Sequence, residues 1–378
     1  MIKTLHVLRG FASLAVVFYH LDIPLPGGNH TDLFGVAIFF TISGFLMCLT
    51  TEKTVDKFML KRVLRVLPVY WVAIPVTLLW YGTGLANPFY TVPTLAHMIQ
   101  SDPGHVAPFI FNNLVASLNP QMVQRAVFTG FLWPKTVSFT PIIGVGWTLT
   151  IEMVCYVVFG ASIWLSRKYG IIIAFCSVSA TFLIGSTLIS PDQQLWQNFV
   201  YLPPFASGLI AFYLWKHVIA QLKVGRVIFL LMAAVSASVY VYLVLSQVAL
   251  SGQRYSDYLA GGASLAIVAA ALLLERSGVR VANQLFQLLG TISYSLYLIH
   301  SQIIDALRTL WENTSFPNPH HTAGGVAVNM GICVLFGLLF YRAVERPLVT
   351  LGHKITASLN RSPTTSRASY EASPERVL

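Results

Sequence analysis

The chain has 378 residues, of which 55% are hydrophobic and only 10% are charged. So little charge cannot cover a soluble globule, and the composition therefore excludes an ordinary soluble enzyme and predicts a polytopic membrane protein. The formal net charge of +10 is by itself compatible with a nucleic-acid partner, so the positions of the cations along the chain matter.

Ten apolar segments are long enough to cross about 30 Å of hydrocarbon as helices. They are residues 5–21, 34–49, 64–81, 145–165, 171–189, 199–215, 227–248, 258–274, 285–307 and 323–341. An even number of spans leaves both termini on the same side of the membrane. The sequence therefore predicts an all-α fold with about ten transmembrane helices.

The positions of the lysines and arginines indicate on which side of the membrane the two termini lie. With both termini in the cytoplasm, four of the 24 lysines and arginines fall on outward links, namely Arg125, Lys135, Arg254 and Arg308. The others gather at the inner face, as is usual in membrane proteins. We therefore expect cytoplasmic termini, a multi-pass protein of the cell inner (plasma) membrane, membrane lipids as partners and no nucleic acid.

The chain is predicted to form one domain followed by a tail. Residues 1–352 would be the transmembrane domain and residues 353–378 a cytoplasmic, largely disordered tail, because the chain is polar and Ser-rich from Asn360 onward. The long outward link, 82–144, contains an apolar patch at 108–118 that is too short to span the membrane.

The four cysteines lie within apolar segments. Cys48, Cys155, Cys176 and Cys333 are therefore expected to be small buried side chains rather than disulfide partners or metal ligands. No metal is predicted.

Arg9 and His20 enclose ten largely apolar residues in the first segment. In an α-helix this separation is close to three turns, so both side chains project from one face, about 16 Å apart along the axis. In the predicted orientation, Arg9 lies toward the cytoplasm and His20 near the outer end. The spacing predicts a continuous helix with both side chains facing one shared cavity.

Titratable side chains at membrane depth are costly and commonly mark function. Four of them are expected at a similar depth in the outer half of the bundle: His20, Glu152, His300 and Asp305. We interpret His20 and Glu152 as a pair, in which the imidazole is a general base and the carboxylate orients it and balances its charge. His300 and Asp305 are also compatible with interfacial residues that extend to the headgroups.

Arg62 and Arg65 are three residues apart and share one helix face at the predicted inner end of segment 64–81. Ordinary topological arginines are common at such positions. Arg9 is placed at the same face, however, and guanidinium groups suit the phosphates of a ligand. A cytosolic ligand held there could extend an arm of roughly 15–20 Å up the bundle, comparable with the Arg9–His20 span, and coenzyme A has this shape.

Six sequence motifs occur together in an order typical of one family. They are the Arg9–His20 pair; GVAIFFTISGFLM from Gly35; Arg62-x-x-Arg65 followed by Pro68 and Tyr70; WTLTIE from Trp147 to Glu152; SYSLYLIH from Ser293 to His300; and RAVERP from Arg342 to Pro347. With these motifs the chain resembles the acyltransferase-3 family of integral membrane acyltransferases, which use acyl-CoA to modify sugars and other hydroxylated acceptors. The resemblance extends to about Gly352 and is to the sugar O-acetyltransferase type without an appended soluble hydrolase-like domain. One departure is Thr148, where the family pattern has a serine, and it keeps the hydroxyl.

This resemblance implies catalytic, donor-binding and acceptor-binding functions for particular side chains. They comprise His20 and Glu152 as catalytic residues, Arg9, Arg62 and Arg65 as binders of acyl-CoA, and Trp147, Tyr297 and His300 as binders of substrate. Acyl-CoA, with acetyl-CoA as the expected form, would be the donor co-substrate.

The predicted reaction moves an acyl group, acetyl by resemblance, from cytoplasmic acyl-CoA to a hydroxyl of a surface or lipid-linked glycan, with His20 as base. Direct transfer and a route through an acyl-histidine both stay open. A small diffusible glycoside is the next acceptor considered. The alternative class is a proton-coupled secondary transporter of a small sugar or glycolipid, although the sequence shows no pair of similar halves.

Overall fold

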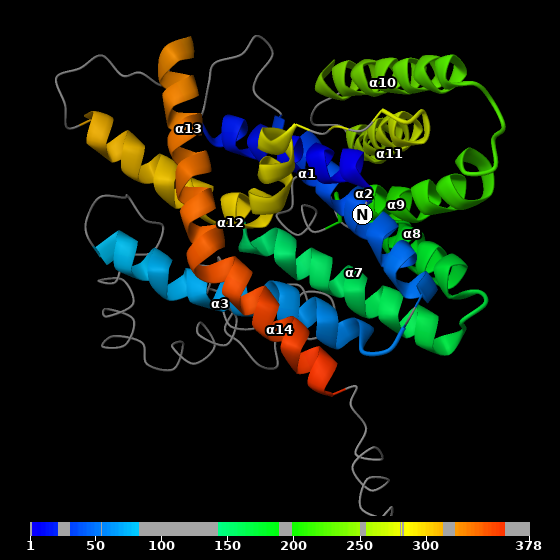
Figure 1. The fold of residues 1–378 in the computed structure, drawn as a ribbon, viewed down its shortest axis with the longest axis horizontal. Coiled ribbons are helices and arrows are strands. Elements are labelled where there is room, and N and C mark those ends of the chain that lie inside the picture. Colours follow the sequence, from blue (N-terminus) through cyan, green and yellow to red (C-terminus); the bar gives the residue numbers. More distant parts are fainter. Residues whose placement is uncertain are drawn as a thin grey trace, which may run out of the picture.

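The computed structural model describes residues 2–21, 31–53, 55–82, 143–188, 199–249, 255–279, 281, 283–312 and 322–359. Every regular element in these residues is a helix (Figure 1), which confirms the all-α prediction for this part of the chain. In chain order the elements are α1 (Lys3–His20), α2 (Thr31–Lys53), α3 (Phe58–Gly82), α7 (Gly146–Leu165), α8 (Gly170–Leu188), α9 (Leu202–Leu214), η2 (Trp215–Ile219), α10 (Arg226–Ala249), α11 (Tyr255–Arg276), α12 (Gln284–Glu312), α13 (Ala323–Phe340), η4 (Tyr341–Glu345) and α14 (Arg346–Ser358).

Each of the predicted apolar segments overlaps a helix, but not every helix meets the length and apolarity of a membrane span. Six stretches in the described residues do: Gly35–Glu52, Gly146–Leu165, Gly170–Thr187, Arg226–Ser246, Leu259–Arg276 and Ala323–Ser358. The other predicted segments form α1, α3, α9 and α12. Helix α9 has only 13 residues, and α1, α3 and α12 contain charged and polar side chains.

Apolar side chains face outward on several helices, which is the reverse of a soluble protein. On α10, Val227, Leu231, Val235 and Leu245 are all exposed, and this helix packs mainly against α11. Contiguous apolar surface of this kind suits contact with lipid tails. The structure is that of a multi-pass membrane protein.

The cysteine prediction holds for three of the four residues. Cys48, Cys155 and Cys333 are free and buried. Cys176 is free but exposed, so the prediction that it is buried was wrong. It lies on α8, where several neighbouring apolar side chains, such as Ile172 and Leu183, also face outward. An apolar run therefore did not distinguish a packed helix face from an outward one.

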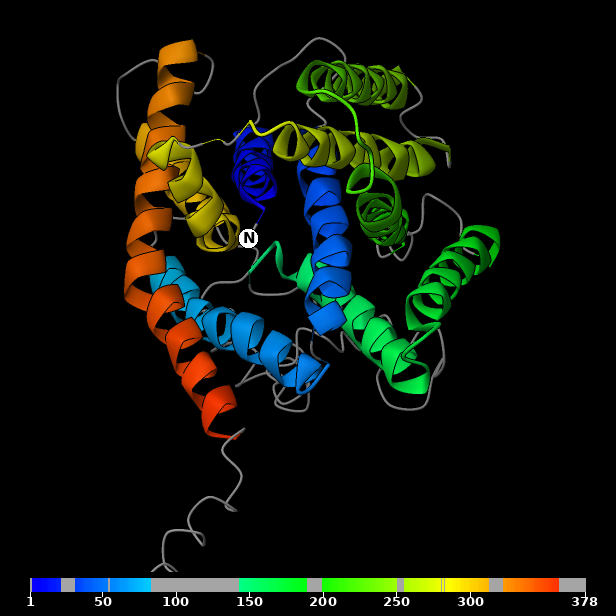
Figure 2. The ribbon, with the colours of Figure 1, turned by 45° about the vertical axis from the view of Figure 1, so that its right-hand side comes forward.

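Helix α1 packs against α2 and α12 in the interior of the bundle (Figure 2). Glycines permit these close approaches. A Cβ on Gly290 of α12 would lie 2.2 Å from the backbone oxygen of His6, and one on Gly35 of α2 would lie 2.6 Å from the backbone oxygen of Ala12. These glycines hold α1 against two of the helices that form the site described below.

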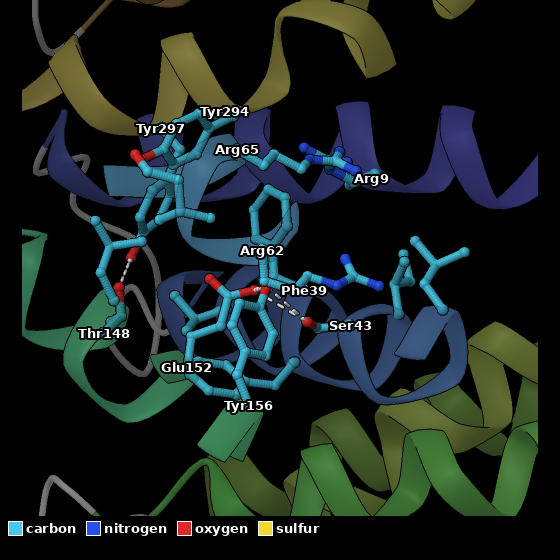
Figure 3. A pocket seen from close by; sticks show the side chains of 16 residues that line it. Arg9, Phe39, Ser43, Arg62, Arg65, Thr148, Glu152, Tyr156, Tyr294 and Tyr297 are labelled. Carbon is cyan, nitrogen blue, oxygen red and sulfur yellow. Dashed lines mark hydrogen bonds between the residues drawn. The ribbon is translucent and has the colours of Figure 1, made fainter. Parts of the chain in front are cut away.

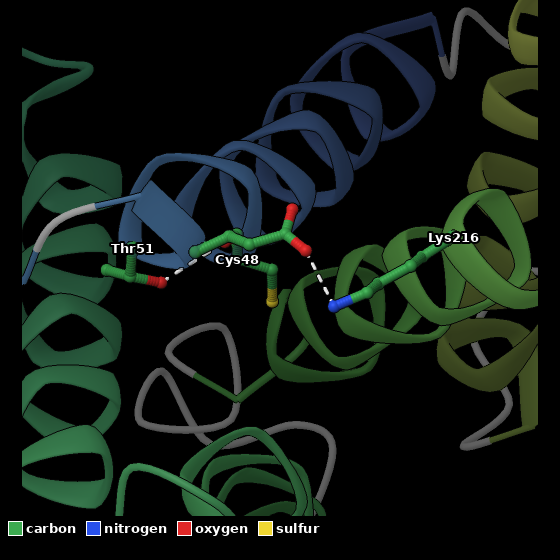
Figure 4. A network of polar contacts seen from close by, with 4 residues as sticks. Cys48, Thr51 and Lys216 are labelled. Atoms are coloured by element: carbon green, nitrogen blue, oxygen red, sulfur yellow. Dashed lines mark hydrogen bonds and ion pairs between the residues drawn. The ribbon is translucent and has the colours of Figure 1, made fainter.

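The C-terminal end of α2 is tied to the π-helical turn that follows α9. Lys216 of η2 forms an ion pair with Glu52 at 2.6 Å (Figure 4). The two side chains are 46% and 41% exposed, so the pair contributes about 0–1 kcal/mol. Thr51 donates to the backbone oxygen of Met47 at 2.7 Å, beside the buried Cys48. The contacts fix the end of α2 without forming a separate reactive site.

Helices α13 and α14, with η4 between them, form one continuous rod along an edge of the bundle (Figure 2). The rod continues to Ser358, past the predicted domain boundary at residue 352. Gly352 lies against α3, where an added Cβ would be 3.2 Å from Leu64 Cβ. The predicted tail from Asn360 onward and the patch at 108–118 lie outside the described residues.

Candidate active site

A cavity lies among α1, α2, α3, α7 and α12 (Figure 3). It encloses about 790 Å³ of space, including the part that is open to the surroundings. Its lining is mostly apolar along α2 and mostly polar or charged elsewhere. The lining residues are Arg9, Val36, Phe39, Phe40, Ile42, Ser43, Leu46, Arg62, Arg65, Val66, Thr148, Leu149, Glu152, Tyr156, Tyr294 and Tyr297. The cavity thus brings together the predicted arginines, Glu152 and Tyr297.

Arg9, Arg62 and Arg65 converge on this cavity from α1 and α3. The Arg62 guanidinium donates from Nη2 to Thr50 Oγ1 at 3.1 Å and lies 5.5 Å from the centre of the Tyr156 ring. Arg9 and Arg65 are close enough to interact electrostatically, so their like charges repel. Within the described residues, none of the three forms an ion pair with a carboxylate. Glu345 and Glu152 interact favourably with Arg9 and offset part of this repulsion, and an anionic ligand would offset it further.

Glu152 is held in the cavity wall by hydrogen bonds from two hydroxyl groups. Its Oε1 accepts from Ser43 Oγ of α2 at 2.9 Å. The same oxygen accepts from the hydroxyl of Tyr156, one turn later on α7. These two donors fix the carboxylate in the cavity and link α2 to α7.

A second carboxylate reaches the arginines from the C-terminal rod. Glu345 Oε2 accepts from the backbone N–H of Ser295 at 3.1 Å and from its Oγ at 2.5 Å. Glu345 also interacts electrostatically with Arg9 and Arg65. It lies in the π-helical turn η4, and such turns are frequent at functional sites. The turn therefore connects the rod to both α12 and the cationic end of the cavity.

Figure 3 shows Tyr297 and Thr148 at the end of the cavity away from Arg9. Their hydroxyl oxygens are 2.7 Å apart, and the Tyr297 ring centre lies 5.5 Å from that of Phe39. The threonine that replaces the family's serine thus retains a hydroxyl contact. The predicted substrate-binding residue Trp147 is outside the cavity lining and packs against Tyr201, with ring centres 5.7 Å apart.

His20 and His300 meet beside Tyr297. Their ring centres are 4.8 Å apart, and His300 Nε2 lies 3.3 Å from His20 Nδ1. His20 Nδ1 also lies 3.0 Å from the backbone oxygen of Val16. The ring of His300 is 6.0 Å from that of Tyr297, centre to centre. The histidine pair therefore adjoins the wall of the cavity at its non-cationic end.

The structure differs from the sequence-based expectations in three respects. Helix α1 is continuous, as predicted, but His20 is not among the residues that line the cavity with Arg9. The ring of His20 contacts His300 of α12, whereas Glu152 is hydrogen-bonded by α2 and by its own helix. His300, expected to bind substrate, is 0% exposed and presents no surface to one.

Sequence reasoning missed several side chains of the site. Tyr156 is four residues after Glu152, so its position on the same helix face could have indicated the contact. Ser43 and Glu345 lie inside family motifs but received no individual function. Their relevance depends on which helices are neighbours, which no local pattern reveals. Within the part of the chain that the structure describes, no group of three or more His, Cys, Asp or Glu is placed to hold a metal ion.

The fold and the site define a multi-pass helical membrane protein whose arginine-lined cavity adjoins a pair of histidines. Comparison with known families identifies the class of reaction. The chain belongs to the acyltransferase-3 family, whose sequence profile, described as an acyltransferase domain, matches residues 2–338. The resemblance inferred from the six motifs is thereby confirmed, and the protein is a membrane acyltransferase.

Two relatives extend this comparison. The chain is 27% identical over 346 residues to the exopolysaccharide production protein ExoZ of Rhizobium meliloti (strain 1021), across 86% of this chain and 92% of ExoZ. It is 24% identical over 225 residues to a protein assigned as acetyltransferase ORF330 of Acidianus two-tailed virus, across 56% of this chain and 57% of that protein. No solved structure matches the chain.

Proposed function

We propose that this protein transfers an acyl group, specifically acetyl, from cytoplasmic acyl-CoA to a hydroxyl of a surface or lipid-linked glycan, in the inner (plasma) membrane. The observation that supports this most strongly is the cavity, which has three guanidinium groups at one end and adjoins the histidine pair at the other. A CoA ester has its phosphates and its thioester at opposite ends of a flexible arm. The rise from Arg9 to His20 along α1, about 16 Å, is comparable with that arm.

In the proposed reaction, Arg9, Arg62 and Arg65 pair with the phosphates of the donor. His20 removes the proton from the acceptor hydroxyl, whose oxygen attacks the thioester carbonyl. The carbon–sulfur bond then breaks, and the CoA thiolate receives the proton from His20. The alternative order forms an acyl-histidine at His20 before the acceptor attacks.

Glu152, Trp147 and Tyr297 complete the proposed assignments. We assign Glu152 to electrostatic stabilisation from the cavity wall, because its carboxylate is oriented by Ser43 and Tyr156 rather than by His20. Tyr297, at the cavity end that adjoins the histidine pair, is assigned to substrate binding. Trp147 packs on Tyr201 outside the cavity lining, and its contact with substrate stays a prediction. The names of the relatives, exopolysaccharide production and acetyltransferase, support a glycan acceptor and an acetyl group.

The test of this function is mass spectrometry of surface glycans from cells with and without the gene. We expect an acetyl group on a glycan hydroxyl to be lost with the gene and restored with it. In parallel, acetyl-CoA is expected to raise the unfolding temperature of the detergent-solubilised protein. Unchanged glycans, together with substrate-driven proton flux that does not depend on CoA, would instead support the transporter.

Arg65→Ala is expected to weaken acetyl-CoA binding by about tenfold or more, because it removes a charged hydrogen-bond donor worth about 1.5–3 kcal/mol. Titration of the purified protein with acetyl-CoA, followed by thermal unfolding or calorimetry, measures the change. Arg167→Ala is the matched control, since Arg167 is exposed in the turn between α7 and α8 and lies outside the cavity. Equal acetyl-CoA affinity in the two variants would show that Arg65 does not bind the donor and is an ordinary arginine of the inner membrane face.

A further inference from the structure

We propose that His300 is a positioning residue for His20. In this assignment, His300 Nε2 accepts a hydrogen bond from His20 Nδ1–H, which leaves His20 Nε2 as the basic nitrogen and stabilises the positive charge that forms when this nitrogen takes a proton. The inference rests on the proposed function, in which His20 is the base. It replaces the direct substrate contact expected for His300 with an action through His20.

The backbone sets the hydrogen position on His300. His300 Nδ1 lies 2.8 Å from the backbone oxygen of Tyr297 and 3.2 Å from that of Leu296. Carbonyl oxygens only accept hydrogen bonds, so Nδ1 is the nitrogen with the hydrogen. The ring is 0% exposed, where an additional charge would be costly. Nε2 is therefore left with a lone pair that points toward His20.

The same reasoning fixes the tautomer of His20. Its Nδ1 faces two acceptors, the backbone oxygen of Val16 at 3.0 Å and His300 Nε2 at 3.3 Å. Nδ1 therefore has the hydrogen and shares it between them. In the neutral ring the other nitrogen, Nε2, is unprotonated, as a general base requires. Three backbone carbonyls thus determine the tautomers of both rings.

His300 restrains the His20 ring from a second helix, which the carbonyl of Val16 does not do. Val16 is on the same helix as His20, whereas His300 fixes the ring from α12 and blocks its rotation. When His20 Nε2 takes a proton, Nδ1–H becomes a charge-assisted donor, and its bond to the lone pair of His300 strengthens. His300 then occupies the position that a carboxylate has in a Ser-His-Asp triad, but as a neutral partner. Asp305, further along α12, is within electrostatic range of His20.

The test compares His300→Leu with His300→Gln in the full-length purified protein. His300→Leu removes the acceptor and is expected to lower kcat by about 100-fold, at the lower end of the usual contribution of a general base. The KM for acetyl-CoA should change by less than about twofold, because the arginines are at the other end of the cavity. His300→Gln places Oε1 near the former Nε2 position and is expected to restore kcat at least about tenfold over His300→Leu.

A spectroscopic readout is independent of turnover. In protein labelled with nitrogen-15 histidine, the signals of His20 are identified by their loss in His20→Ala. They are expected to show hydrogen on Nδ1 and a bare Nε2 in the neutral ring of the wild-type protein. This measurement tests the tautomer even where His300→Leu does not fold.

The outcomes separate the inference from the proposed function. If His20→Ala remains active, the proposed function itself fails. Suppose that His20→Ala is inactive. The positioning role is then refuted, and the proposed function stands, if folded His300→Leu keeps the wild-type kcat or if its kcat is no lower than that of His300→Gln. A wild-type His20 with its hydrogen on Nε2 also refutes it. Asp305→Asn, which leaves both ring contacts in place, should lower kcat less than His300→Leu does.

Discussion

His20→Ala is expected to lower kcat for acyl transfer by about 10²–10⁴-fold, the range that a general base typically contributes. The reason lies in the arrangement around the ring. Nδ1 is engaged by Val16 and His300, so Nε2 is the nitrogen available to take a proton. The measurement is transfer of labelled acetyl from acetyl-CoA to the acceptor glycan by purified protein.

Two controls make this result interpretable. Acetyl-CoA affinity of His20→Ala should stay within about twofold of wild type, because the proposed phosphate contacts are at the cationic end of the cavity. His353→Ala should behave as wild type, since His353 is exposed on α14 and does not line the cavity. Normal turnover by folded His20→Ala would remove His20 from the mechanism. Joint loss of turnover and acetyl-CoA binding would indicate a structural role instead.

The helices could be predicted from sequence because an apolar run is a local signal. Helix α1 was predicted even though Arg9 interrupts it, since the apolar residues around Arg9 maintain the pattern. The end of the last helix was not predicted. The last predicted segment ends at residue 341 and the predicted domain at residue 352, but in the structure Gly352 is in close contact with Leu64 of α3, and the helix continues to Ser358. The end of this helix therefore depends on the packing of two segments that are distant in the sequence, which a local pattern does not reveal.

In the site, too, contacts within one helix could be predicted from the sequence, whereas contacts between distant helices could not. Arg62 and Arg65 share a helix face at a spacing of three residues, and both line the cavity as expected. The partner of His20 could not be found in this way, because His300 is separated from it by 280 positions and by most of the helices. Glu152 was an equally reasonable partner by depth alone. In the structure the Glu152 carboxylate is instead hydrogen-bonded by Ser43 and Tyr156, and the contact with Ser43 depends on the placement of α2 against α7.

Gly290→Ala is expected to force α1 and α12 apart and to lower both stability and turnover. The added Cβ would lie 2.2 Å from the backbone oxygen of His6, and a backbone atom cannot move aside by changing rotamer. Overpacking of this kind typically costs about 1–3 kcal/mol. Because α1 and α12 supply His20 and His300, their separation lengthens a contact that is already 3.3 Å, at the long end of the hydrogen-bond range.

The consequence is a specific pattern of effects for Gly290→Ala. Acetyl-CoA affinity should fall to some extent, because Arg9 is on α1. Turnover should fall more, because it depends on the alignment of His20 with His300, whereas Arg62 and Arg65 are on α3 and do not move with the α1–α12 contact. Gly331→Ala on α13 is the matched control, since a Cβ there meets nothing within 4 Å, and surface changes of this kind usually stay within about 0.5 kcal/mol. Thermal unfolding and kcat are measured on both variants. Wild-type values for Gly290→Ala would show that the bundle can relax around a Cβ at this position, and that the alignment of His20 with His300 does not depend on the close approach of α1 to α12.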